Sequence, residues 1–415
     1  MSPPGLRTRD FKVGWICAIL SEHVVACQML DEEYHDAPSD FPAHDNNVYT
    51  YGRIGSHHVV IACLPKGRYG KVPAASVSRD MDRSFPALRF VMMVGIGDGA
   101  PTERCDVRLG DVVVSEPFRR TGGVIHYDHG KTIQNRAFEP TGSFNKPPAV
   151  VLSAMQKLSG RHKRNGHNIA EIITTMVYLN PRLARTYQRP DGNTDVLYKS
   201  SLIHTNDQPS CSAECAFHTE DIVHRPQRPP GEDDPCIHYG LIASADQLMK
   251  DAILRDALAE KEGVLCFEME AAGLMDNIPC LVVRGISDYS DTHKNDLWQG
   301  YAAATAAAYA RELLLVVPGD PQQLSGEQSH DLNAIVEDKM SFVGTQLSDD
   351  SLQTPTPSID ATKATSSVTD RIKFANDIIM KGIAFYVRGE NKFSRVGPPE
   401  EPGRGGLCAI LQRDS

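Results

Sequence analysis

The sequence predicts a single three-layer α/β domain, in which a mostly parallel, twisted central sheet is flanked by helices, followed by a low-complexity tail. Short apolar runs alternate with helical stretches, which is typical of a parallel sheet covered on both faces. The hydrophobic fraction of 41% and the charged fraction of 23% are those of a soluble globular protein. After residue 318 the composition changes to Ser, Thr, Gln, Asp and Pro, which indicates the end of the folded domain.

The first half of the domain contains a series of buried-strand patterns. Residues 13–20 (VGWICAIL) are nearly all apolar and lead into a helical pattern at 23–33. The elements expected next are a strand at 59–63, a helix at 72–84, a strand at 90–94, a glycine-rich loop at 95–99 and a strand at 111–115.

The second half continues the alternation after an interruption. Strands are expected at 242–244, 264–267 and 280–284, and an Ala-rich buried helix at 301–317. Between about 159 and 237 the pattern gives way to Pro, Asp, Arg and His after a helical stretch at 170–185, which indicates an insertion or a long loop. A lid and an oligomer contact are the two roles considered for it. Ligands of such sheets bind beyond the carboxyl ends of the strands.

The expected organisation is thus a catalytic domain over residues 11–318 and a tail over 319–415. Residues 319–367 have too little apolar content to fold alone, so disorder is expected there. Residues 368–387 are compatible with one amphipathic helix.

Charge and targeting signals narrow the partners. The formal net charge is −10, which disfavours a nucleic-acid partner. No secretory segment follows the polar N-terminus and no apolar stretch is long enough to span a membrane, so we expect a cytoplasmic protein with no membrane partner. The ten cysteines are scattered, which favours reduced thiols.

Carboxylates cluster where two of the expected strands end. The segment 267–273 (FEMEAAG) carries Glu268 and Glu270, and the segment 282–288 (VVRGISD) ends in Asp288. Burying a carboxylate costs several kcal/mol unless it is paired or hydrogen-bonded. Each acid alone is more often structural than catalytic, so the combination is what indicates a functional site.

This combination resembles the nucleoside phosphorylase/nucleosidase superfamily, in which a Met-Glu-x-Glu-type segment and a Ser-Asp at the next strand end form the purine-ribose site. Four further segments agree with the family in chain order, and two runs look like fungal members found as N-terminal domains of NLR-type immune receptors. The four are 13–22, Gly70-Lys71-Val72, the glycine loop 95–99 and 109–113, and the two runs are 238–244 and 298–304.

The resemblance implies a purine N-glycosidase that hydrolyses the base–ribose bond of a purine nucleoside or adenine nucleotide (adenosine or ATP). Asp288 would protonate the leaving purine, Ser287 would orient it, and Glu22 would deprotonate the attacking water. Glu270 would bind the ribose hydroxyls and Met269 would pack against the sugar. The other substrate-binding positions implied are Phe267, Leu248, Gly95 and Gly97.

Two positions depart from the family pattern. Leu248 stands where an aromatic residue often lies under the base, so base stacking is expected to be weaker. Asp98 stands in the glycine loop where relatives commonly have another glycine. An acid there would repel phosphate, and a turn-stabilising Asp is an equal alternative. Asp288 must also hold a proton near neutral pH, which requires an apolar or acidic environment.

Glu22 favours water over phosphate as the nucleophile, and Arg68, Arg104 and Arg108 form no recognisable phosphate clamp. A phosphate-dependent purine nucleoside phosphorylase and a non-catalytic purine-sensing module of an immune protein are the alternatives. If the substrate is a nucleotide, its phosphates would contact cations such as Arg68, Lys71 and Lys294. No cofactor or metal is expected, although Cys211, Cys215 and His218 have ligand types that suit zinc. The family also implies a homo-oligomer.

Overall fold

The computed structural model describes residues 5–319, apart from 135–138, 143, 205–214, 216–218, 230–231, 276–277 and 295. Two compact units are distinguished, Met1–Ala334 and Ile335–Ser415, and every described element lies in the first. The expected tail, apart from Gly319, and its helix at 368–387 therefore fall outside the described residues.

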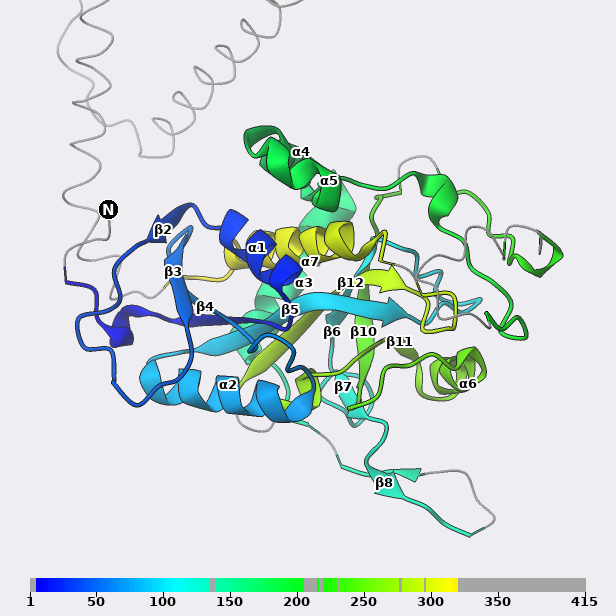
Figure 1. Cartoon of the computed structure of the whole chain (residues 1–415), viewed down its shortest axis with the longest axis horizontal. Coiled ribbons are helices and arrows are strands. Elements are labelled where there is room, and N and C mark those ends of the chain that lie inside the picture. The colour runs from blue at the N-terminus through cyan, green and yellow to red at the C-terminus, as the bar shows by residue number, and fades with distance from the viewer. Residues whose placement is uncertain are drawn as a thin grey trace, which may run out of the picture. The chain divides into compact units, whose positions relative to one another are not determined.

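One large mixed sheet forms the centre of the described unit (Figure 1). Its strands follow the order β11-β10-β6-β12-β5-β1-β4-β3-β2, with β7 beside β10. Their bounds are β1 Val13–Cys17, β2 Glu32–Tyr34, β3 Tyr49–Ile54, β4 His57–Cys63, β5 Phe90–Gly99, β6 Val112–Ser115, β7 Val124–His126, β10 Ile237–Ser244, β11 Val264–Glu268 and β12 Cys280–Asp288. A separate hairpin pairs β8 Gly130–Lys131 with β9 Glu139–Pro140.

Part of this sheet closes on itself. Strand β11 pairs in parallel with β10 and also pairs antiparallel with β5, through Cys266↔Gly99 and Phe267↔Asp98. The strands β5, β12, β6, β10 and β11 therefore form a closed ring, with the β12–β6 pair antiparallel as well. The α/β class is confirmed, whereas the expectation of a three-layer domain built on a mostly parallel sheet is wrong, because the ring gives a barrel-like core.

The closure depends on the length of β5. The sequence indicated a strand that ends at Val94 and a glycine loop beyond it, but β5 continues to Gly99 without interruption. Glycines are depleted in strands except where backbones approach closely. At Gly97 an added Cβ would lie 3.1 Å from the Phe267 carbonyl oxygen, so the glycine allows β11 to approach β5.

Helices cover the sheet, with α1 and α7 on one side and α2 on the other (Figure 1). Gly285 lets the Ala-rich α7 lie directly on β12, since a Cβ there would be 1.8 Å from the Ala302 carbonyl oxygen. The α-helices are α1 Leu20–Gln28, α2 Lys71–Ser84, α3 Ala149–Asn165, α4 Ile169–Leu179, α5 Ala184–Tyr187, α6 Ala252–Glu262 and α7 Gln299–Leu314. Short 3-10 turns occupy Thr8–Asp10, Pro181–Leu183, Gly192–Thr194, Thr219–Asp221 and Ala271–Gly273. None of the described helices is both long enough and apolar enough to cross a membrane.

The described parts of the expected insertion pack against the α/β core. Its expected start at 159 falls inside α3, which begins earlier and runs to Asn165. The Trp298 indole Nε1–H donates to Thr194 Oγ1 (3.0 Å), and the Tyr289 hydroxyl contacts Asp195. Asp195 in turn pairs with Arg225 (3.0 Å). These contacts hold the insertion against the segment that follows β12.

Candidate active site

A pocket of about 140 Å³ lies at the carboxyl ends of β1, β5 and β11, with Arg284 entering from the middle of β12. The ends of β1 and β5 meet here because parallel strands end at one edge of a sheet, and the antiparallel pairing of β11 with the end of β5 brings Phe267 and Glu268 to the same place. The lining residues are Ala18, Ile19, Glu22, Tyr69, Ile96, Gly97, Asp98, Leu248, Phe267, Glu268, Met269, Glu270, Arg284 and Lys294. The structure thus brings most of the expected site residues into one pocket.

Glu22 is held in place by three backbone amides. Its Oε2 accepts from Ala18 N (2.6 Å) and Ile19 N (3.2 Å), and its Oε1 accepts from Ile96 N (2.8 Å). Two of these bonds cap the first turn of α1, which explains how a carboxylate is kept in a buried position. Burial raises the pKa of Glu22, while Arg284 and the three amides oppose that rise.

Arg284 is a fully buried cation among three carboxylates. Its Nη2 pairs with Glu268 and lies 3.4 Å from Glu270 Oε2, and its Nη1 donates to the Ile96 carbonyl oxygen (3.2 Å). Burial disfavours the charged guanidinium, but Glu268, Glu270 and Glu22 together raise the pKa of Arg284. One cation therefore compensates three buried acids only in part.

Glu270 joins this cluster to the turn before α2. Its Oε1 accepts from Gly70 N (3.3 Å), and Gly70 has a positive φ of 97° that favours glycine. The Gly-Lys-Val segment thus serves the second acid of the Glu-x-Glu motif. Burial raises the pKa of Glu270 to about 7; Arg284 opposes this rise, and the nearby Glu268 and Glu22 add to it.

Asp288 lies at the end of β12 and is held by its neighbours. Its Oδ1 accepts from Ser290 N (3.1 Å), and its Oδ2 accepts from the Ser287 hydroxyl (3.2 Å), so Ser287 is positioned to orient it. Lys294 Nζ lies 2.7 Å from Asp288 Oδ2 and 3.0 Å from Asp98 Oδ1. The carboxylate expected to act as an acid therefore has both a cation and a second carboxylate beside it.

The remaining expected residues are divided between the pocket and its surroundings. Phe267, Met269, Leu248 and Gly97 line the pocket, with the Leu248 side chain 43% exposed. Gly95 lies behind it, beside Glu22 and Arg284. Of the three cations expected for phosphates, Lys71 pairs with Asp128 (3.2 Å) and Asp246 (3.3 Å), Lys294 pairs with Asp98 and Asp288, and Arg68 is exposed.

The amino-acid sequence is similar to those of several known proteins. The chain is 43% identical over 325 residues to a nucleotide-binding leucine-rich repeat (NLR)-like protein of Hyaloscypha variabilis, covering 77% of this chain and 30% of that protein's length. It is 21% identical over 323 residues to a 5′-methylthioadenosine/S-adenosylhomocysteine nucleosidase of Mycobacterium bovis, covering 74% and 96% respectively. It is 35% identical over 79 residues to the ATP nucleosidase Cap17 of Escherichia coli, covering 18% and 16%. No family model matches the chain.

The chain belongs to the nucleoside phosphorylase/nucleosidase superfamily. Among solved structures it aligns with futalosine hydrolase of Helicobacter pylori at a TM-score of 0.45 and 15% identity, covering 74% of this chain and 97% of that one. The chain spans less than a third of the length of its NLR-like relative, and the alignment includes 30% of that protein.

Glu268 and Arg284 received no role in the site expected from the sequence. Glu268 and Arg284 form the buried ion pair at the centre of the site, and Glu268 also accepts from Glu270 N (3.1 Å) and Ala271 N (2.9 Å). The signal that was available is the arginine itself, since a charge inside the apolar run VVRGIS needs a buried partner. Glu268 of the FEMEAAG segment supplies that partner.

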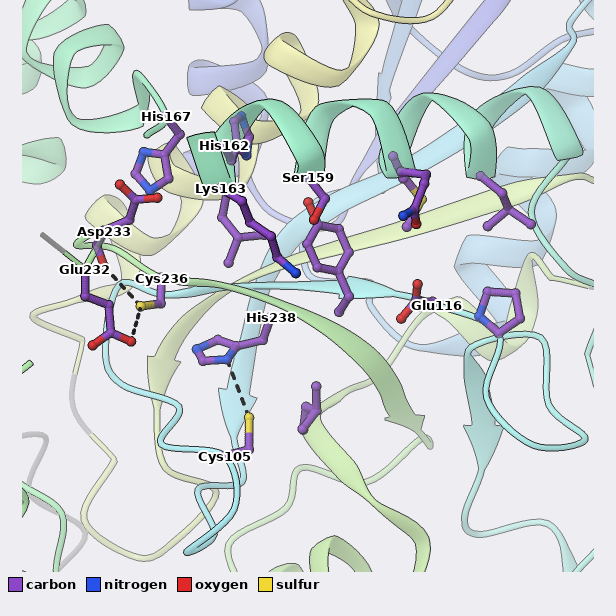
Figure 2. Close-up of a pocket in the computed structure, with 17 residues that line it drawn as sticks. Cys105, Glu116, Ser159, His162, Lys163, His167, Glu232, Asp233, Cys236 and His238 are labelled. Atoms are coloured by element: carbon purple, nitrogen blue, oxygen red, sulfur yellow. Dashed lines mark hydrogen bonds between the residues drawn. The ribbon is translucent and has the colours of Figure 1, made fainter. Parts of the chain in front are cut away.

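A larger cavity of about 820 Å³ lies at the other end of β10 and contains none of the expected site residues of the superfamily (Figure 2). There the Cys105 Sγ lies 3.5 Å from His238 Nδ1, and His238 Nε2 lies 2.8 Å from Asp111 Oδ2. Burial opposes the charged imidazole, but Asp111 and Cys105 prevail and raise the pKa of His238 to about 9. This cavity is lined by Glu116, Glu232 and Asp233 but by none of the acids that the family motifs indicate, which is why we place the candidate site in the smaller pocket.

The zinc alternative is only partly covered by the structure. Cys211 and His218 lie outside the described residues, and Cys215 Sγ is 3.4 Å from His204 Nδ1. Within the described part of the chain, no group of three or more His, Cys, Asp or Glu side chains is arranged to hold a metal ion.

Proposed function

We propose that the chain is a purine N-glycosidase, which hydrolyses the bond between a purine base and ribose to give free base and ribose or ribose phosphate. The observation that carries the proposal is the placement of acids around one small pocket. Glu22 and Glu270 lie beside Arg284, and Asp288 lies beyond Asp98 and Lys294.

Glu22 is proposed as the general base that deprotonates water. Its two oxygens already accept from three amides, so its orientation is fixed before substrate binds. A base works best when its pKa is near the working pH, and burial raises the pKa of Glu22 in that direction. The proton of the attacking water would pass to this carboxylate as the hydroxyl bonds to the sugar carbon.

Glu270 is proposed to bind the ribose hydroxyls, with Arg284 holding it in place. Hydroxyls donate to a carboxylate, and such charge-assisted hydrogen bonds are roughly twice as strong as neutral ones. The contact of Arg284 with Glu270 and the amide of Gly70 fix the carboxylate from two sides. Met269 and Phe267 supply the apolar contact in the same pocket.

Asp288 is proposed to protonate the purine as it leaves. Cleavage of the glycosidic bond places negative charge on the base, and a neighbouring acid removes that charge by giving up its proton. The Ser287 hydroxyl contacts Asp288 Oδ2 and fixes the direction of the carboxyl group. The buried position of Asp288 keeps bulk water from competing for the same proton.

The charges of the pocket support water rather than phosphate as the nucleophile. Four carboxyl groups line the pocket, those of Glu22, Asp98, Glu268 and Glu270, and a fifth, Asp288, contacts its lysine. The two cations of the pocket, Arg284 and Lys294, are both already paired with acids. A phosphorylase needs fixed cations that are available to inorganic phosphate. Hydrolysis is therefore the better-supported reaction.

An adenine-containing substrate is supported by the relatives, since two of them are named for methylthioadenosine/adenosylhomocysteine and for ATP. Adenosine and ATP differ only at the 5′ carbon of the ribose, and Arg68 is an exposed cation next to Tyr69 at the pocket. We propose Arg68 as the phosphate contact if ATP is the substrate.

A homo-oligomer is also proposed. Apolar side chains near the pocket are exposed, with Leu20 at 73%, Tyr69 at 62% and Val72 at 75%. Large exposed apolar side chains support an interaction surface at this part of the molecule. Light scattering coupled to size exclusion would measure the mass in solution, and a monomer at all concentrations would refute this part.

The activity is tested by incubating the protein with adenosine, inosine, guanosine and ATP, with and without phosphate, and measuring free base by chromatography. Base release without phosphate is expected, and Asp288→Asn and Glu22→Gln should each lower it on the order of 10²–10⁴-fold. The matched control is Glu171→Gln, which changes an exposed acid on α4. Release that depends on phosphate would favour the phosphorylase, and no release from any substrate would refute the enzyme.

A further inference from the structure

We propose that Asp98 and Asp288 share a single proton beside Lys294, and that Asp98 is the positioning residue that keeps Asp288 in its acid form. This inference rests on the proposed function, in which Asp288 protonates the leaving base. It assigns a new role to Asp98, for which the sequence indicated a turn-stabilising residue, and to Lys294, for which it indicated a phosphate contact.

The two carboxyl groups are brought together by strand pairing. Asp98 and Asp288 are register partners on the parallel strands β5 and β12, where the register shifts after Ile286. Asp98 is 6% exposed and Asp288 is 3% exposed. Since β5 runs through Gly99, Asp98 is a strand residue, and the expectation of a turn-stabilising Asp is wrong.

Lys294 bridges the pair from the segment between β12 and α7. Its Nζ lies 3.0 Å from Asp98 Oδ1 and 2.7 Å from Asp288 Oδ2. The cation therefore contacts one oxygen of each acid and holds both carboxyl groups at a fixed spacing. Burial disfavours the charged ammonium, but the two acids prevail and raise the pKa of Lys294. Lys294 is therefore a cation at neutral pH.

The net charge of Asp98, Asp288 and Lys294 together indicates that the two carboxyl groups hold one proton between them. Two ionised carboxylates and one ammonium carry a net charge of −1, whereas the same group with one proton is neutral. A buried site favours the neutral arrangement, and two like charges in contact cannot both ionise readily. Burial and the neighbouring Asp288 raise the pKa of Asp98 well above its ordinary value, while Lys294 opposes that rise.

The other titratable groups around the pair do not supply this proton. Tyr127 and Cys266 are near Asp98, and burial together with nearby acids raises the pKa of both. Glu268 is paired with Arg284, so its negative charge is compensated there rather than by the Asp98–Asp288 pair. We call Asp98 and Asp288 the dyad. Ser287 and Ser290 contribute a hydroxyl and an amide to Asp288. Asp98 therefore raises the affinity of Asp288 for the shared proton, and Lys294 lowers it.

In the proposed reaction the dyad donates one proton and Glu22 accepts one. As the carbon–nitrogen bond breaks, its electron pair goes to the purine, and the dyad gives its proton to a ring nitrogen of the base. The base leaves neutral, and the two carboxylates are left with Lys294 as their only bridging cation. Water loses a proton to Glu22 and its oxygen bonds to the sugar. Return of that proton to the dyad through solvent restores the starting state.

The inference predicts opposite effects for two substitutions. Asp98→Asn removes the like charge, so Asp288 beside Lys294 loses its proton at lower pH. Lys294→Gln removes the cation, so the pair keeps its proton to higher pH. Loss of packing alone would move both variants in the same direction or change the rate equally at every pH.

The experiment is a pH titration of the aspartate carboxyl carbons by ¹³C NMR in the full chain without substrate, with signals assigned from the Asp98→Asn and Asp288→Asn variants. In the wild type we expect the two carboxyls to titrate as a coupled pair with one proton bound at neutral pH. The affinity of Asp288 for its proton should fall at least tenfold in Asp98→Asn and rise in Lys294→Gln. Base release should follow, with the alkaline limb of its pH profile moved down and up respectively.

An Asp288 that is already ionised at pH 6 in the wild type, or that titrates unchanged in Asp98→Asn, would overturn the inference. If Asp98→Asn does not fold, Lys294→Gln decides alone, and a downward or absent shift there overturns it. The carboxyl titration is independent of turnover. A titrating dyad without base release would refute the proposed function only, and base release without a shared proton would refute this inference only.

Discussion

Glu22 and Arg284 approach each other across Gly95, where no side chain separates them. A Cβ at this position would lie 2.2 Å from Glu22 Oε1 and 2.8 Å from Arg284 Nη1, far closer than non-bonded atoms allow. Gly95 is in the extended part of β5, so close approach rather than an unusual φ requires the glycine. The carboxylate and the guanidinium therefore depend on this position for their arrangement.

Gly95→Ala is expected to lower base release strongly while leaving most of the fold intact. The methyl group displaces Glu22 from its amide partners, and loss of a positioned base typically costs on the order of 10²–10⁴-fold in rate. Single-turnover assays would measure the rate, and circular dichroism would check the fold. The matched control is Gly192→Ala, where no atom lies within 4 Å of the added carbon. Unchanged turnover in Gly95→Ala would contradict the placement of Glu22.

Glu270→Gln is expected to raise the KM for nucleoside and remove its pH dependence near neutrality. The pKa of Glu270 is raised to about 7, so the carboxylate that accepts from the ribose hydroxyls forms as pH rises through 7. In the wild type, KM should therefore fall between pH 6 and 8. The amide of the variant has no charge to lose, so its KM should stay high and flat. A KM in Glu270→Gln that still falls over this range would assign the effect to another group.

Arg284→Met is expected to destabilise the fold by roughly 3–5 kcal/mol, because Glu268 and Glu270 are left buried without a cation. The loss should be smaller at pH 5, because the pKa of Glu270 is raised to about 7 and its protonation removes part of the uncompensated charge. Urea unfolding at pH 5 and pH 8 measures both values. Arg164→Met, at an exposed position of α3, is the control and should change stability by less than about 0.5 kcal/mol.

His238→Gln tests the contact with Asp111 in the larger cavity. The folded pKa of about 9 lies above the ordinary value of 6.5, so this histidine adds stability that is fully present below pH 6.5 and is lost as pH rises through 9. The free energy of unfolding of the wild type should exceed that of the variant by up to about 3 kcal/mol at pH 6. The difference should shrink by pH 10. A difference that is constant from pH 6 to 10 would show that His238 is not charged in the folded protein.

Local patterns predicted the strands that lie in the middle of the sheet. The apolar runs at β1, β4 and β6 are short and bounded by turns, so hydrophobic periodicity places them within a few residues. The closed ring was not predicted, because the pairing of Phe267 with Asp98 joins strands separated by well over a hundred residues. The end of β5 was missed because three glycines in five residues indicate a loop in any local scheme.

The candidate site was predicted in part for a related reason. Family motifs indicated Glu22, Glu270 and Asp288; the first two line one pocket, and Asp288 contacts Lys294 of the same pocket. The partners that set their charge, Arg284 for Glu270 and Asp98 with Lys294 for Asp288, depend on side-chain directions that a motif does not contain. Lys294 in particular was expected to contact phosphate, whereas it pairs with two acids.

The pairing of β11 with β5 has a consequence for how this protein could change its substrate. The group that would bind the sugar follows β11, and the acid pair lies on β5 and β12, so backbone hydrogen bonds fix the spacing between the two ends of the scissile bond. Tyr69 and Leu248, by contrast, come from connecting segments at the pocket and belong to neither strand. Under the proposed function, selectivity for the far end of the sugar can therefore change by loop substitution without altering the spacing that the strand pairing sets.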